Sequence, residues 1–161
     1  MNMKRNRIAV IGVGNTLLAD EGAGIHALRL LRRNLNGDEV DLIEAGTPGM
    51  GLLHHLQERD KVIFVDSGRC GLQPGEFRRF LPQEAISRKP QMKFTLHDFD
   101  LVSMLQWVQE NGIAESTELV VYCIQASKVQ MSQRLSEAVR RSLSGLVETI
   151  CREIREDTDH A

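Results

Sequence analysis

Aromatic side chains are scarce in this sequence: Phe, Trp and Tyr make up 4% of the 161 residues, while apolar residues as a whole make up 42%. The core is therefore expected to be aliphatic. An excess of charge of one sign is also lacking, because 20 Lys and Arg residues face 22 Asp and Glu residues, for a net charge of −2. Without a basic excess, the electrostatic attraction that drives nucleic-acid binding is missing, so we expect no nucleic-acid partner.

Long apolar runs and closely spaced cysteines are absent as well. No stretch approaches the roughly 20 apolar residues that a membrane helix requires, and no signal-peptide core follows the basic N-terminus. The three cysteines, Cys70, Cys123 and Cys151, are scattered and form no Cys-x-x-Cys pair. An odd, scattered set is typical of reduced thiols, so we expect a cytoplasmic protein that has no membrane partner.

The order of apolar segments indicates one α/β domain. No linker, repeat or low-complexity tract interrupts residues 1–161, which we expect to form a single domain. Helical spacing predicts helices that begin near residues 20, 47, 95 and 131; the last has an apolar stripe to Ile154 and a polar tail that should fray. Apolar runs predict five strands, at residues 7–12, 40–44, 61–66, 75–80 and 118–124.

The connections between these segments predict the topology of the sheet. Helices link the first strand to the second and the second to the third, so these three strands should run parallel. The connection over residues 67–74 contains no predicted helix, so the strand that follows should be an antiparallel edge strand. We therefore predict a three-layer α/β/α sandwich around a five-stranded, mostly parallel mixed sheet.

Three polar residues follow or flank predicted strands where a ligand is expected. In an open parallel sheet, ligands bind beyond the carboxyl ends of the strands. Glu21 follows the first strand, Asp66 ends the third, and His97 opens a later helix. Each has an ordinary explanation, as a helix-dipole partner, a turn cap or a polar helix start. Two carboxylates and an imidazole that converge at one sheet edge nevertheless form a metal-ligand set with open coordination positions.

A pair of glycines after the first strand has two interpretations. Gly12-x-Gly14 is the beginning of a dinucleotide fingerprint, but Leu17 stands where the third glycine is needed. Asp20 and Glu21 also place negative charge where a pyrophosphate requires a positive helix end. We therefore interpret the glycines as positions of a sharp turn and close packing.

Four segments together resemble the hydrogenase maturation proteases. Residues 11–24, which read IGVGNTLLADEGAG, strongly resemble the opening motif of that family. Residues 44–50 resemble its acidic-x-Gly-Thr segment, residues 62–66 its apolar strand ending in Asp, and residues 95–98 its helix-opening His. The resemblance extends from about residue 8 to the final helix.

The resemblance implies a fold, an activity and a partner. Members of this family are endopeptidases that remove a C-terminal peptide from the large-subunit precursor of nickel–iron hydrogenases after nickel insertion. Their fold is an α/β/α sandwich with a five-stranded mixed sheet. The match of motifs assigns metal ligation to Glu21, Asp66 and His97, with Glu21 and Asp66 also as catalytic candidates. The metal is expected to be nickel brought by the precursor, and another divalent ion can take its place.

A second set of residues is implied in substrate binding: Glu44, Gly46 and Thr47. The acidic-Gly-Gly-Thr pattern common in the family has Ala45 at its second position and Glu rather than the shorter Asp at its first. Because the side chain of Glu44 reaches one methylene further, its role follows less directly from the resemblance than the three metal ligands do.

Several alternatives stay open at this level. The sequence contains neither an HExxH zinc-protease motif nor an evident Ser-His-Asp or Cys-His constellation. Nickel could polarise the scissile carbonyl or activate water, or a carboxylate could act as general base with the metal as a recognition tag. A catalytic thiol at Cys70 is a minor hypothesis. A peptidyl-tRNA hydrolase-like enzyme and a noncatalytic nickel-binding chaperone are competing functions.

Overall fold

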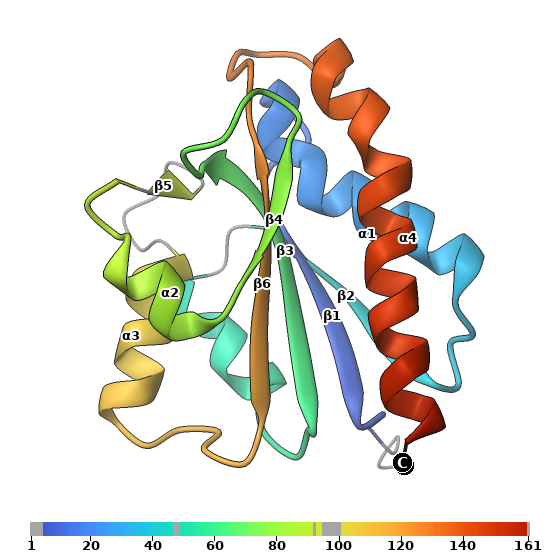
Figure 1. Cartoon of the computed structure of the whole chain (residues 1–161), viewed down its shortest axis with the longest axis vertical. Helices are drawn as coiled ribbons and strands as arrows, with labels where there is room; N and C mark the ends of the chain where they lie inside the picture. The colour runs from blue at the N-terminus through green and yellow to red at the C-terminus, as the bar shows by residue number, and fades with distance from the viewer. Residues whose placement is uncertain (1–4, 47–48, 92, 95–100, 161) are drawn as a thin grey trace.

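The computed structural model describes residues 5–46, 49–91, 93–94 and 101–160, with the backbone alone at 93–94. Its main strands lie in the order β2-β1-β3-β6-β4 (Figure 1). The pairs β1–β2, β1–β3 and β3–β6 are parallel, whereas β4 pairs antiparallel with β6 at the edge of the sheet, as the helix-free connection predicts. The strands are β1 (Ile8–Val13), β2 (Val40–Gly46), β3 (Lys61–Arg69), β4 (Phe77–Phe80) and β6 (Glu118–Gln125). An additional two-residue strand, β5 (Lys93–Phe94), pairs antiparallel with the end of β3.

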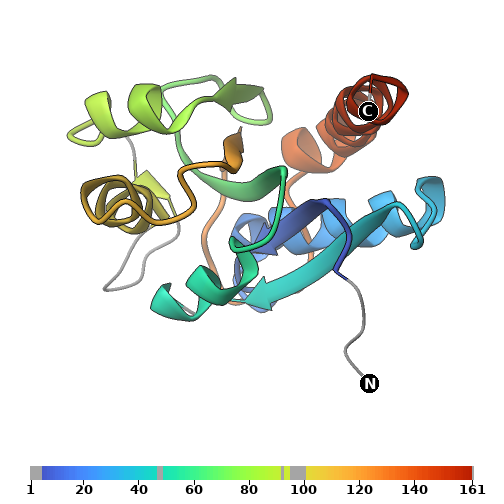
Figure 2. The same cartoon turned by 90° about the horizontal axis from the view of Figure 1, so that it is seen from below.

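Helices cover both faces of the sheet, which confirms the three-layer sandwich (Figure 2). Successive side chains of a strand point to opposite faces, so Ile63 and Val65 enter one apolar core and Val62 and Phe64 the other. One face carries α1 (Ala23–Asn34) and α4 (Glu137–Asp159). The other carries the 3₁₀ helix η2 (Gly49–His55), α2 (Pro82–Ser87) and α3, which is described over Leu101–Glu110.

The ends of the helices differ from the sequence prediction in informative ways. The first helix is preceded by a separate 3₁₀ turn, η1 (Ala19–Gly22), so Glu21 does not lie in an α-helix. The final helix begins at Glu137 rather than near Met131, because Ser136 caps it by accepting a hydrogen bond from the Val139 N–H (3.4 Å). Its tail does not fray at residue 155, and Asp157 in that tail accepts a hydrogen bond from Lys61 (2.7 Å).

Two further helix predictions need correction or lie beyond the described chain. The segment after β2 forms a 3₁₀ helix instead of the predicted α-helix, and α2 was not predicted at all. The predicted helix start at residues 95–98 falls outside the described residues. Among the residues that are described, no helix is long and apolar enough to cross a membrane.

Candidate functional site

The turn after β1 brings Glu21 to the carboxyl edge of the sheet. Gly14 has φ +136°, and a Cβ atom there would lie 1.9 Å from the carbonyl oxygen of Glu21. Only glycine allows this approach, which agrees with our interpretation of the Gly12-x-Gly14 pair as a site of close packing. The Asn15 N–H then donates to the same carbonyl oxygen (3.1 Å). The glycine turn thereby fixes the position of η1 against the end of β1.

The side chain of Glu21 is buried but incompletely hydrogen-bonded. It is 3% exposed, and within the described part of the chain its Oε2 atom has no hydrogen-bond partner. Burying a polar oxygen without a donor is costly, and such atoms in native proteins need an explanation. Because η1 packs against β3, the unpartnered oxygen lies in the part of the fold where Asp66 was predicted to contribute a second carboxylate.

Asp66 and Ser67 form the buried end of the apolar run in β3. Asp66 is completely buried, and its Oδ1 accepts a hydrogen bond from the Ser67 N–H (2.8 Å). Ser67 is also completely buried, and its hydroxyl has no partner among the described residues. Ser67 is not among the residues predicted from the sequence, although its position directly after Asp66 was a usable signal. The edge of the sheet thus holds two unpartnered oxygens, one from Glu21 and one from Ser67.

The structure describes two of the three predicted metal ligands, Glu21 and Asp66. His97 and Thr47 lie outside the described residues. Among those that are described, no group of three His, Cys, Asp or Glu side chains is arranged to hold a metal ion. The three-ligand set of Glu21, Asp66 and His97 therefore stays a prediction.

The two described residues that we predicted to bind substrate, Glu44 and Gly46, lie on β2 and contact different parts of the fold. Glu44 pairs with Arg29 (3.1 Å) and Arg32 (3.6 Å) of α1. The hydrogen bond from Arg29, followed by the charges of both arginines, lowers the pKa of the Glu44 carboxyl although partial burial opposes this. Gly46, at φ +60°, accepts a hydrogen bond from the Gly14 N–H (2.8 Å). Gly46 therefore joins the end of β2 to the turn that carries Glu21, whereas the carboxylate of Glu44 is held by α1.

Asp20, which in the sequence stands out only as a negative charge, joins two distant segments of the chain. It is completely buried, and its carboxylate accepts hydrogen bonds from the N–H groups of Ser127 (2.8 Å), Lys128 (2.8 Å) and Ser136 (2.7 Å). The Ser136 hydroxyl donates a fourth hydrogen bond (2.8 Å). Asp20 thus fastens the segment between β6 and α4 to the turn that contains Glu21.

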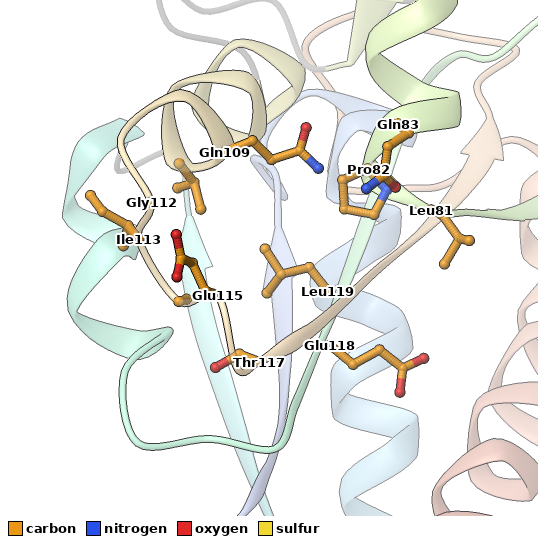
Figure 3. A pocket seen from close by; sticks show the side chains of 12 residues that line it. Leu81, Pro82, Gln83, Gln109, Gly112, Ile113, Glu115, Thr117, Glu118 and Leu119 are labelled. Carbon is orange, nitrogen blue, oxygen red and sulfur yellow. The ribbon is translucent and has the colours of Figure 1, made fainter.

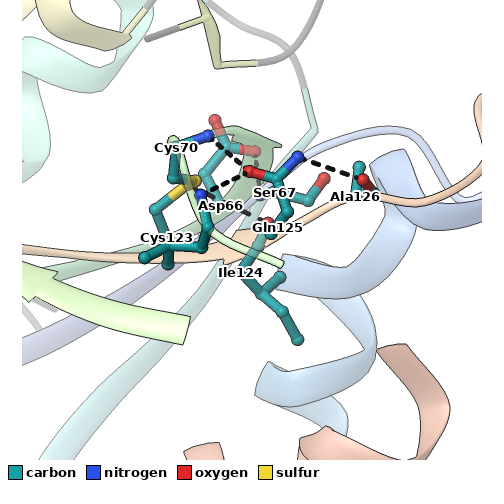
Figure 4. Close-up of a disulfide and its surroundings, with 8 residues drawn as sticks. Asp66, Ser67, Cys70, Cys123, Ile124, Gln125 and Ala126 are labelled. Carbon is teal, nitrogen blue, oxygen red and sulfur yellow. Dashed lines mark hydrogen bonds between the residues drawn. A yellow bond between two sulfur atoms is a disulfide. The ribbon is translucent and has the colours of Figure 1, made fainter. Parts of the chain in front are cut away.

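The structure joins Cys70 and Cys123 in a disulfide, so the prediction of three reduced thiols is wrong for this pair (Figure 4). Both residues are buried, and their Cα atoms are 6.5 Å apart. Cys123 is the register partner of Asp66 in the β3–β6 ladder, so the disulfide lies beside the candidate site. Gln125 Oε1 accepts the N–H of Cys70 (2.8 Å) and holds the loop after β3 in place. A disulfide-bonded Cys70 cannot serve as a nucleophile.

Removing this disulfide is expected to lower stability without removing activity. The Cys70→Ala, Cys123→Ala double variant should lose about 3 kcal/mol of unfolding free energy relative to the oxidised protein, because the bond closes a long loop in the unfolded chain. Urea unfolding measures the loss, with Cys151→Ala as the control. Alkylation in denaturant without reductant should modify one thiol in the oxidised protein, that of Cys151. Modification of three thiols would contradict the bond.

A hollow at the opposite end of the sheet contains none of the candidate residues. Its volume is about 390 Å³, and it lies between α2, the end of α3 and the start of β6 (Figure 3). Leu81, Ile113 and Leu119 supply apolar lining, and Glu115 and Glu118 supply carboxylates. Since parallel sheets bind ligands at the carboxyl ends of their strands, this hollow is in the wrong place to serve as the site.

The same fold occurs in a solved endopeptidase. The structure of the hydrogenase maturating endopeptidase HybD from E. coli has a TM-score of 0.80 with this one, over 94% of this chain and 93% of that chain, at 26% sequence identity. The shared fold, over nearly the whole of both chains, places this chain in the class of α/β/α endopeptidases that HybD represents.

The sequence comparisons specify the family within this class. A model of the hydrogenase maturation proteases matches residues 25–153, a range that includes Asp66 and His97 and begins just after Glu21. A putative hydrogenase maturation protease from Methanocaldococcus jannaschii is 30% identical over 95% of this chain and 99% of its own length. The hydrogenase expression/formation protein HupD from Bradyrhizobium diazoefficiens is 28% identical over 94% of this chain and 79% of its own length. The chain belongs to the hydrogenase maturation protease family, which confirms the resemblance and replaces the peptidyl-tRNA hydrolase alternative.

Proposed function

We propose that this peptidase removes the C-terminal peptide from the large-subunit precursor of a nickel–iron hydrogenase after nickel has been inserted. Membership of the maturation protease family supports the reaction class and the partner. The observation that carries the proposal is the buried, unpartnered Oε2 of Glu21 at the carboxyl edge of the sheet. A ligand carried by the substrate would supply the partner that this oxygen lacks.

We assign three residues to the nickel ion of the precursor, which in this reaction is part of the substrate: Glu21, Asp66 and His97. Carboxylate and imidazole donors suit a divalent ion of this kind. The hydrogen bond from the Ser67 N–H orients the Asp66 carboxylate, while Oε2 of Glu21 has no competing donor in the described structure. Glu21 and Asp66 are also the catalytic candidates, since a carboxylate beside the scissile bond can take a proton from the attacking water.

We also propose a cellular location for the reaction and residues that bind the substrate. Residues 1–161 would act as one domain in the cytoplasm, with no membrane or nucleic-acid partner. Gly46 and Thr47 would hold the substrate backbone next to the ion. Glu44, whose carboxylate is paired with Arg29 of α1, would contribute to substrate binding through that carboxylate.

A processing assay with matched precursors tests the proposal. The purified protein is incubated with nickel-loaded and nickel-free large-subunit precursor, and both the mass and the nickel content of the product are measured. We expect shortening of the nickel-loaded precursor alone. A change in nickel content without shortening would identify a chaperone instead, and equal cleavage of both precursors would refute recognition through nickel.

A further inference from the structure

Exposed apolar side chains gather on the two segments that Asp20 fastens together. Leu17 is 50% exposed, Val129 48% and Met131 80%. We refer to these three residues as the apolar lip. Within the described residues, the other large apolar side chains with such exposure are dispersed over η2, the end of β4 and α3: Met50, Leu81 and Trp107. Scattered exposed apolar residues need no explanation, but a group of them beside a candidate site indicates an interaction surface.

The backbone places two residues of the lip side by side. Leu18 and Ser132 form a parallel bridge, in which the Ser132 N–H donates to the Leu17 carbonyl oxygen (2.9 Å). The Ala19 N–H donates to the Ser132 carbonyl oxygen (2.7 Å). Leu17 and Met131 occupy the preceding positions of the same register, so their side chains start from neighbouring points. The segment that follows β6 can be seen at the top of Figure 1, together with the start of α4.

The lip rests on a firmly held support. The carboxylate of Asp20 accepts three backbone hydrogen bonds and one from a hydroxyl, all from the segment that carries Val129 and Met131. The Asp20 N–H also donates to the Lys128 carbonyl oxygen (3.1 Å). Exposure of Met131 is therefore a property of a braced segment, and a braced apolar surface loses little conformational entropy when it binds a partner.

We propose that the apolar lip binds apolar side chains of the precursor polypeptide next to its scissile bond. The proposal rests on the proposed function, because it takes the precursor as the occupant. Leu17 lies on the loop that leads directly into η1, so the lip is continuous in the chain with the turn that carries Glu21, the residue to which we assign the precursor's nickel. The flexible thioether chain of Met131 can adapt to the varied apolar side chains of such a segment.

Charge variants of the lip test this role through binding and rate separately. Leu17→Asp and Met131→Asp should each raise KM for nickel-loaded precursor about tenfold and leave kcat within about twofold, because they remove apolar contacts made before and during the reaction. Met131→Leu, which keeps the side chain apolar, should leave KM at the wild-type value. The matched control is Leu81→Asp, which changes a residue 40% exposed at the other end of the sheet and should leave KM unchanged.

Binding of the precursor by calorimetry separates failure of the lip from failure of the proposed function. Unchanged KM and Kd in both Asp variants, with normal cleavage by the wild type, would overturn the lip alone. A wild type that binds precursor without cutting it would overturn the peptidase assignment, and the lip would then be judged by whether Kd rises in the variants. A wild-type dimer that Met131→Asp converts to monomers, at unchanged Kd for precursor, would assign the lip to a second copy of the chain and refute the proposal.

Discussion

Glu21→Gln and Asp66→Asn should each slow processing of nickel-loaded precursor by about 10³-fold or more, the range expected when a group that carries a proton or a substrate charge is lost. Both substitutions preserve the size of the side chain and remove its negative charge. The unfolding free energy should change by less than about 1 kcal/mol, because each amide keeps the size of the side chain and one oxygen that can accept a hydrogen bond. Mass measurement of the precursor over time gives the rate, and urea unfolding gives the stability.

A matched cysteine variant distinguishes this result from thiol catalysis. Cys70→Ala removes the disulfide next to Asp66 and leaves both carboxylates in place. It should therefore still process the precursor. Full activity in the two carboxylate variants, together with inactivity of Cys70→Ala, would identify a cysteine peptidase and refute our assignment.

Asp20→Ala should have the largest effect on stability, with a loss of about 4 kcal/mol of unfolding free energy. The substitution leaves three backbone N–H groups and one hydroxyl without their acceptor, and each unsatisfied buried donor costs roughly 1–3 kcal/mol before water compensates part of it. Asp20→Asn keeps one carbonyl oxygen as acceptor and should lose about half as much.

Urea unfolding at neutral pH measures both Asp20 variants. Asp38→Ala is the control, because Asp38 is an exposed carboxylate in the turn before β2 and its removal should change stability by less than about 0.5 kcal/mol. A loss below about 1 kcal/mol in Asp20→Ala would show that water or a rearranged loop replaces the carboxylate, and that the segment after β6 does not depend on it.

The strands and their directions could be predicted from the sequence, because they depend on residues that are close together in the chain. The buried strands are short apolar runs, and the missing helix before β4 correctly predicted an antiparallel edge strand. The start of α4 could not be found in this way. Its apolar spacing continues back to Met131, but hydrogen bonds from Ser136 to Asp20, 116 residues away in the chain, hold the preceding segment out of the helix.

The candidate site also combines features that nearby residues determine with features that depend on contacts between distant segments. Glu21 and Asp66 could be named as candidates because each follows or ends a strand, and the apolar run of a buried strand is visible in the sequence. The Cys70–Cys123 bond depends on the pairing of β3 with β6 across 53 residues, which the spacing of the cysteines does not reveal. The unpartnered hydroxyl of Ser67 likewise depends on what other elements place around it.

The hydrogen bonds of Asp20 also make the turn with Glu21 depend on a segment more than 100 residues away in the chain. The turn with Glu21 precedes β2 and β3 in the chain, whereas the segment from Ser127 to Ser136 that braces it follows β6. A chain folded only as far as β3 would therefore hold this turn through Gly14, Asn15 and β3 alone, without the hydrogen bonds to Asp20. Since the proposed apolar lip is shared between the same two segments, the lip and the complete support of the Glu21 turn both require these segments to fold against each other.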